Sequence, residues 1–135
     1  MEIKKNCTLS TTDSKIKCEE NKRKIIFNNK NRVSAEKITV DNCQITSGVR
    51  CDYLVRHEKK EYFVELKGED IKHAFEQLAR SITLLGSDDC QLRKSFIISS
   101  RSPLASAQIQ NIRLKFKKKY SSDLIVKNNS FEEDL

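Results

Sequence analysis

Apolar and polar residues alternate in the middle of the chain, in two β-rich runs at Cys51–Arg56 and Glu61–Lys67. Four polar residues separate the runs, and loops of this length commonly connect antiparallel strands. The pattern therefore predicts a β-hairpin. In its register Asp52 lies opposite Glu65 on one face, which also carries Leu54 and Phe63. The side chains that share the other face, which can be buried, are Tyr53, Val55, Tyr62, Val64 and Leu66.

Two amphipathic helices are predicted after the hairpin. Asp70 is a suitable N-cap for the first, which runs to about Leu85 with apolar residues at spacings of three and four. Ser102 and Pro103 provide an N-cap and a first-turn proline for the second, which runs from about position 104 to Tyr120. Its apolar positions predict four buried residues, which are Ala105, Ile109, Ile112 and Phe116.

Short apolar runs predict four more strands, at residues 24–28, 37–45, 94–99 and 123–127. Strands alternate with helices after the hairpin, so the order predicts an α/β fold with a mixed central β-sheet flanked by helices. A chain of 135 residues is long enough for one such domain, expected over residues 23–128. Residues 1–22 are polar and aperiodic and predict a flexible or loosely packed arm, and residues 129–135 an acidic tail.

The charge and cysteine content restrict the class of protein. Charged residues make up 33% of the chain and the formal net charge is +7, which suits either a polyanionic partner or simply a basic surface. No run of 18 apolar residues or signal-peptide core is present, so we expect a cytoplasmic protein without membrane contact. The five cysteines have no zinc-site spacing and are odd in number, which predicts free, reduced thiols.

The predicted hairpin brings together three residues that could carry chemistry. Two carboxylates that face each other, such as Asp52 and Glu65, repel unless a cation lies between them. A hard divalent metal such as Mg²⁺ is the natural candidate, because it takes carboxylate oxygens, water and phosphate as ligands. Lys67 follows two residues after Glu65 and therefore shares its face of the strand.

This arrangement resembles the PD-(D/E)XK nuclease superfamily, whose signature is an Asp, a variable gap and then Glu-x-Lys on the next strand. Here the signature is Asp52, twelve intervening residues, and then Glu65, Leu66 and Lys67. An amphipathic helix follows, as in the family, although Cys51 replaces the usual proline. The resemblance covers about residues 24–127 and implies a restriction-endonuclease-like core.

The resemblance also implies roles for individual residues. Asp52, Glu65 and the carbonyl group of Leu66 would hold Mg²⁺ or Mn²⁺, and Lys67 would orient the attacking water. Gln77, in the helix after the motif, is similar to a glutamine that helps to arrange the site in many relatives. The implied activity is hydrolysis of phosphodiester bonds in DNA, or less favourably in RNA.

The family usually adds an acidic metal ligand from an N-terminal helix, and here the nearby candidates, Glu19, Glu20 and Glu36, lie in no convincing helix. This departure leaves two alternatives open. One is a catalytically inactive nuclease fold that binds nucleic acid. The other is a protein-interaction module in which the three hairpin residues form an ordinary ion cluster.

The end of the second predicted helix is strongly basic. Its side chains could bind phosphates of a nucleic acid, and they could equally complement the helix dipole. A homodimer is compatible with this sequence as well. The candidate nucleic-acid-binding residues are Arg113, Lys115, Lys117 and Lys118.

Overall fold

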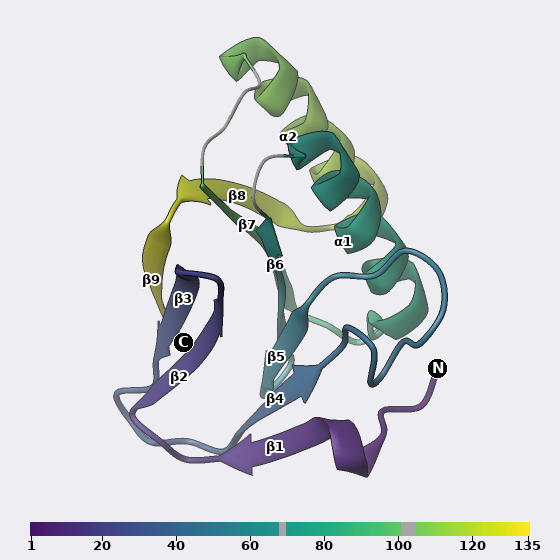
Figure 1. Cartoon of the computed structure of the whole chain (residues 1–135). Helices are drawn as coiled ribbons and strands as arrows, with labels where there is room; N and C mark the ends of the chain where they lie inside the picture. Colours follow the sequence, from purple (N-terminus) through teal and green to yellow (C-terminus); the bar gives the residue numbers. More distant parts are fainter. Residues whose placement is uncertain (68–69, 101–104) are drawn as a thin grey trace.

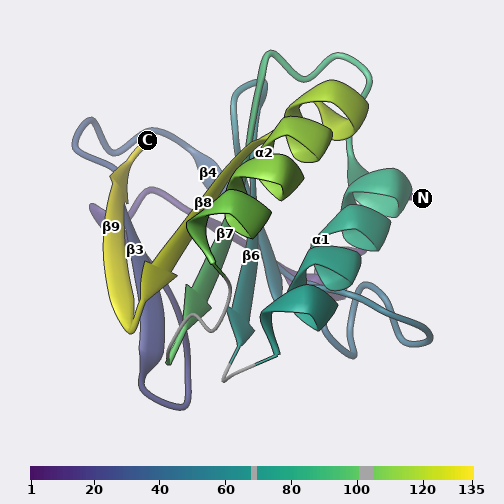
Figure 2. The same cartoon turned by 90° about the horizontal axis from the view of Figure 1, so that it is seen from above.

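Two mixed β-sheets and two α-helices form three layers (Figure 1). The computed structural model describes residues 1–67, 70–100 and 105–135. Both helices lie side by side on one face of a six-stranded sheet, and a three-stranded sheet covers the opposite face (Figures 1 and 2). The predicted mixed sheet is therefore confirmed, but helices cover only one of its faces.

The larger sheet has the strand order β1-β4-β5-β6-β7-β8, in which β5 and β6 are antiparallel and β6, β7 and β8 are parallel. The smaller sheet has the order β2-β3-β9, with β2 and β3 antiparallel and β9 parallel to β3. The strands are β1 (Thr8–Thr11), β2 (Lys15–Glu20), β3 (Arg23–Asn28), β4 (Ala35–Thr39), β5 (Tyr53–His57), β6 (Lys60–Lys67), β7 (Leu92–Ser99), β8 (Asp123–Asn128) and β9 (Ser130–Asp134). A 3-10 turn (Lys5–Cys7) precedes β1, and the helices are α1 (Ile71–Leu85) and α2 (Ser106–Tyr120).

The predicted central hairpin is present as β5 and β6, with Leu54 opposite Phe63 as expected. Its turn has two residues rather than four, because His57 and Lys60 add one more pair to the ladder. The prediction of a single buried face is wrong. Leu54 and Phe63 are fully buried against α1, and the opposite face is buried against the small sheet, because a layer covers each side.

The two helices bury very different amounts of surface. Asp70 caps α1 as predicted, accepting a hydrogen bond from the backbone N–H of His73 at 3.1 Å, and the apolar stripe of α1 is buried. In α2 only Phe116 is buried, so the expectation of four buried residues is wrong for the other three. The helix lies beside α1 and leaves a groove of about 730 Å³ between them. The predicted start signals Ser102 and Pro103 lie outside the described residues.

The N-terminal arm is also different from the expectation. It contains β1 and β2, whereas the sequence predicted a flexible or loosely packed arm there. Strand β2 alternates exposed residues with buried Ile16 and Cys18, and a tight turn at Asn21 and Lys22, both with positive φ, joins it to β3. The alternation is short and interrupted by charges, so it is easily taken for a polar coil.

The acidic tail forms strand β9 rather than a free end. Phe131 packs against Phe96 of the large sheet, with ring centroids 6.2 Å apart. Glu133 forms an ion pair of 2.5 Å with Lys94 of β7. These two contacts explain why so polar a segment is ordered against the core. In the described ranges no helix is both long and apolar enough to cross a membrane.

Cys7 and Cys43 form a disulfide, with Cα atoms 5.8 Å apart, so the prediction that all five cysteines are free is wrong. Cys18, Cys51 and Cys90 are free. The 3-10 turn places Cys7 beside the loop after β4. Sequence spacing could not show this, because the partners are 36 residues apart.

Reduction of this disulfide is expected to lower the free energy of unfolding by about 2–4 kcal/mol, because the unfolded chain regains the entropy of an open loop. Thermal melting of the Cys7→Ser/Cys43→Ser double variant, compared with a Cys90→Ser control, measures the effect. Equal melting temperatures for the two would show that the crosslink contributes nothing to stability.

Candidate functional site

Two buried carboxyl groups meet in the large sheet at the end of its strands where β5 begins and β6 ends. Asp52 immediately precedes β5, where its backbone N–H donates to Val64 O at 3.0 Å, and Glu65 lies in β6. Asp52 is 9% exposed and Glu65 is 2% exposed. The negative charge of Asp52 acts on Glu65, and Asp52 Oδ2 accepts a hydrogen bond of 2.8 Å from the backbone N–H of Leu66. The structure thus brings together the two predicted metal ligands.

The backbone around Asp52 is fixed from two sides. From β4, the N–H groups of Val40 and Asp41 both donate to the carbonyl oxygen of Asp52, at 2.9 and 3.3 Å. These bonds continue the contact between β4 and β5 just before β5 begins. They hold the aspartate where its side chain can turn toward β6.

Helix α1 fixes the segment that leads to Asp52. Gln77 Nε2 donates to the carbonyl oxygen of Arg50 at 3.0 Å, and Ser81 Oγ accepts from the backbone N–H of Cys51 at 2.8 Å. Arg80 Nη1 donates to two carbonyl oxygens of the preceding loop, at 2.7 and 3.0 Å. Gln77 was predicted to arrange the site, whereas Arg80 and Ser81 were missed. Their spacing of three and four residues from Gln77 on one helix face was the available clue.

Burial of both groups, with the negative charge of Asp52 acting on Glu65, keeps a proton on the carboxyl pair. Burial, followed by the negative charge of Asp52, raises the pKa of Glu65 to about 9, while Lys67 acts in the opposite direction. Burial also raises the pKa of Asp52 to about 6, partly offset by its bond from Leu66. The charge of Glu20 contributes to both increases. Without a cation the ionised pair is therefore strained at neutral pH.

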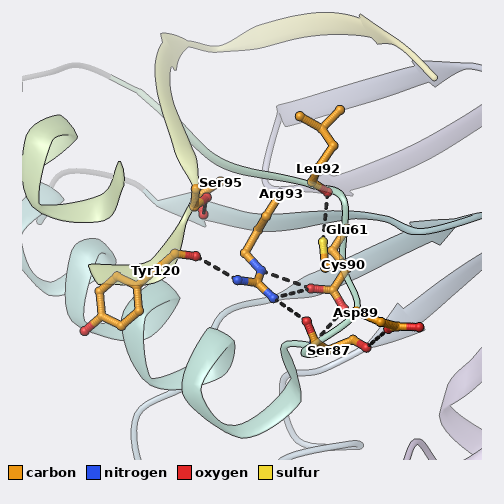
Figure 3. Close-up of polar contacts among 9 residues, drawn as sticks. Glu61, Ser87, Asp89, Cys90, Leu92, Arg93, Ser95 and Tyr120 are labelled. Carbon is orange, nitrogen blue, oxygen red and sulfur yellow. Dashed lines mark hydrogen bonds and ion pairs between the residues drawn. The ribbon is translucent and has the colours of Figure 1, made fainter. Parts of the chain in front are cut away.

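A second buried glutamate on the same strand provides an internal comparison. Glu61, at 3% exposure, lies at the other end of β6 on the same face as Glu65. Its Oε1 accepts bonds of 3.0 and 2.9 Å from Arg93, and its Oε2 accepts from the backbone N–H of Ser87 at 3.0 Å (Figure 3). Arg93 also donates from Nη1 to Tyr120 O at 2.7 Å and from Nη2 to Ser87 O at 3.1 Å. Glu61 is thus neutralised within the fold, as a structural glutamate must be.

Within the described ranges, no hydrogen bond or ion pair neutralises Glu65 as Arg93 neutralises Glu61. Three buried side-chain atoms lack a hydrogen-bond partner among the described residues, and they are Glu65 Oε1, Gln77 Oε1 and Arg23 Nε. Buried polar atoms without partners are rare, and each points to a missing water, ion or ligand. Two are oxygens of predicted site residues. A carboxylate pair with an unpartnered oxygen fits a hard divalent cation, which takes oxygen ligands.

The candidate third acidic ligands are separated by the fold. Glu19 pairs with Lys17 at 3.7 Å, and Glu36 pairs with Arg56 at 2.9 Å. Glu20, at the end of β2, is the one whose charge acts on both site carboxyl groups, and it comes from a strand rather than a helix. Within the described chain, no group of three or more His, Cys, Asp or Glu side chains is positioned to hold a metal.

The predicted nucleic-acid-binding residues are divided between two sides of α2. Arg113 Nε donates to a backbone carbonyl of β8 at 3.2 Å, and Lys117 pairs with Asp123 at 2.8 Å. Lys115 and Lys118 border the groove that faces α1. These four residues therefore do not form one continuous basic patch.

The basic end of α2 is also remote from the carboxyl pair. Tyr120, the last residue of α2, binds Arg93 near the beginning of β7, whereas Asp52 and Glu65 lie at the edge where β6 and β7 end. The two features lie at opposite ends of the strands of the large sheet.

Comparison of the chain with known protein families, with curated proteins and with solved structures finds no match. Functional assignment therefore depends on the geometry of the site.

Proposed function

We propose that this protein is a metal-dependent nuclease that hydrolyses phosphodiester bonds, in DNA by preference over RNA. The observation that carries the proposal is Glu65, which is buried against Asp52 with one oxygen unpartnered. The fully neutralised Glu61 on the same strand shows what a structural glutamate looks like in this fold. The order of β5, β6, α1 and β7 around the pair supports a restriction-endonuclease-like core of the PD-(D/E)XK type.

In this proposal Asp52 and Glu65 hold Mg²⁺ or Mn²⁺, with the carbonyl group of Leu66 as a further ligand. A cation bound there would supply a Lewis acid that polarises a phosphate oxygen and makes a nearby water more acidic. The helix α1 begins just after β6, so its positive N-terminal end lies at the same edge and favours an anionic substrate.

The remaining site residues position groups around the phosphate. Lys67, at the end of β6, orients the attacking water and offsets the negative charge that develops on phosphorus oxygens during attack. Gln77 keeps Asp52 in place through the Arg50 carbonyl group. Its unpartnered Oε1 can accept a bond from water at the site.

A second candidate function is nucleic-acid binding by a nuclease fold that has lost its activity. The observation in its favour is that the described residues offer two closely placed carboxylates rather than three. The candidates differ in metal affinity, because an inactive binding protein needs no cation.

Purified protein is expected to cleave DNA in Mg²⁺ or Mn²⁺ and to be inactive in EDTA. The assay uses single-stranded, duplex and branched DNA, with RNA alongside, because the geometry does not select among the DNA forms. Asp52→Asn should reduce cleavage to background, whereas Asp88→Asn, an exposed control with the same charge change, should be active. DNA binding without cleavage in any metal would favour the second candidate.

A further inference from the structure

The tip of the β2–β3 hairpin lies toward the side of the molecule where β6 and β7 end (Figure 1), and Glu65 lies near the end of β6. Two hydrogen bonds fix it there. Arg23 Nη1 donates to Ser100 Oγ at 3.0 Å, and the backbone N–H of Lys24 donates to Asn129 O at 3.0 Å. Ser100 and Asn129 come directly after β7 and β8, so the tip lies against the ends of the parallel strands.

This contact places Arg23 close to Lys67. Ser99 pairs with Lys67 across β6 and β7, so Ser100 is one residue beyond that pair. Adjacent strands lie about 4.8 Å apart, and one residue advances a strand by about 3.3 Å. Ser100, the residue that Arg23 contacts, is therefore adjacent to the Lys67–Ser99 pair at the ends of β6 and β7.

The guanidinium group of Arg23 is incompletely used within the fold. Its Nε is buried and without a partner, and among the described residues it forms no ion pair, even with Glu20, which is directly opposite in the β2–β3 register. Arg93 is different, because its Nε, Nη1 and Nη2 all donate hydrogen bonds. Leaving a charged donor buried and unpaired costs stability, so a ligand is the expected explanation.

We propose that Arg23 binds a phosphate group of the nucleic acid, adjacent to the phosphate that is cut. The planar guanidinium fork matches two oxygens of a phosphate group, and one of its nitrogens is already oriented by Ser100. The hairpin would hold the substrate backbone across the ends of β6 and β7. This inference extends the proposed function and rests on it for the identity of the substrate.

Arg23→Gln is expected to weaken the binding of a fluorescein-labelled 15-nucleotide oligodeoxythymidylate roughly tenfold or more, since a charge-assisted bond is lost. Fluorescence anisotropy in Ca²⁺ and, separately, in EDTA measures the dissociation constant between about 50 and 200 mM salt. The slope of log affinity against log salt should fall by roughly 0.7. Arg23→Lys should keep most of the slope but regain only part of the affinity, because lysine keeps the charge without the fork.

The matched control is Arg32→Gln, which removes an exposed arginine beyond the opposite end of β3 and should leave the slope unchanged. Arg23→Gln should melt no lower than the parent, because it removes an unsatisfied buried donor. Equal slopes for the Arg23 and Arg32 variants would overturn the inference. So would a lower melting temperature with unchanged affinity, since Arg23 would then be only a structural contact to Ser100.

The inference and the proposed function can fail separately. If the parent cleaves DNA but Arg23→Gln binds it as the parent does, the nuclease proposal stands and the phosphate contact is refuted. If the parent binds DNA through Arg23 but never cleaves it, the contact stands and the protein is a binding protein. A fall in slope on changing Arg113, Lys117 and Lys118 to Gln, with none at Arg23, would place the substrate on α2 instead and refute the inference.

Discussion

Replacing Lys67 with methionine is expected to lower the rate of DNA cleavage by about 100-fold or more, while DNA affinity measured in Ca²⁺ changes by about twofold or less. The ammonium group lies at the end of β6 and acts on the charge of Glu65. Charge on the phosphate oxygens increases only as the reaction proceeds. A contact with that charge is therefore lost mainly from the rate and little from ground-state binding.

Lys60→Met is the matched control for this prediction. Lys60 is half-buried like Lys67 and lies at the opposite end of the same strand, beside the hairpin turn. Its replacement should leave both cleavage and binding close to those of the parent. If Lys67→Met instead loses affinity and rate to the same extent, Lys67 is an anchor for phosphate and has no separate part in the chemistry.

The sequence was sufficient to predict the elements whose local pattern of apolar and polar residues agrees with their tertiary environment. The register of β5 and β6 follows from side-chain alternation, and α1 follows from its apolar stripe and the Asp70 cap. These two elements bring Asp52, Glu65 and Gln77 to one edge of the sheet. The candidate site could therefore be predicted in its central part.

The second layer could not be predicted, because its strands depend on distant partners. Strand β9 is ordered by Phe131 on Phe96 and by Glu133 on Lys94, pairs that are more than 30 residues apart. Strand β2 has only two inward side chains, and its pattern alone does not distinguish it from coil. The small sheet bears on the proposed site, because it carries Glu20, whose charge acts on both carboxyl groups, and Arg23, the proposed phosphate contact.

For α2 the helix was predicted correctly, but the prediction of its buried residues was wrong. Its apolar spacing is helical, and a helix does form, but helical spacing does not say how much of the apolar face another element will cover. Ile109 and Ile112 are only half-buried because α2 packs loosely beside α1. From the sequence its basic residues could equally bind phosphates or complement the helix dipole, and the fold divides them between two surfaces far from the carboxyl pair.

Glu65→Gln is expected to abolish the stabilisation by Mn²⁺ and to leave the metal-free protein at least as stable as the parent. Mn²⁺ should raise the melting temperature of the parent, because a ligand that binds only the native state stabilises it by mass action. The variant loses the anionic ligand, and it also loses the repulsion between Glu65 and Asp52. Melting curves with Mn²⁺, with Mg²⁺ and with EDTA test both effects, with exposed Glu58→Gln as the control for charge.

The pH dependence of the melting temperature of the metal-free parent is a second test of the same carboxyl pair. The folded pKa of Glu65, about 9, is far above its ordinary value of 4.5, and Asp52, Glu20 and Asp41 are the nearby anions, with Lys67 as the nearby cation. A carboxyl group with a raised folded pKa contributes stability that is complete below its unfolded pKa and is lost as pH rises through the folded one. The melting temperature in EDTA should therefore fall from about pH 5 to about pH 9.

Metal affinity should change over the same pH range, but it should rise where the melting temperature of the metal-free protein falls. A cation requires the ionised pair and competes with its proton, so the apparent affinity for Mn²⁺ should rise with pH by up to about tenfold per unit. In Glu65→Gln the fall of melting temperature between these pH values should be shallower, and the response to Mn²⁺ should be absent. If the variant instead responds to Mn²⁺ as the parent does, the cation binds elsewhere, and the carboxyl pair is a structural hydrogen bond that holds a proton.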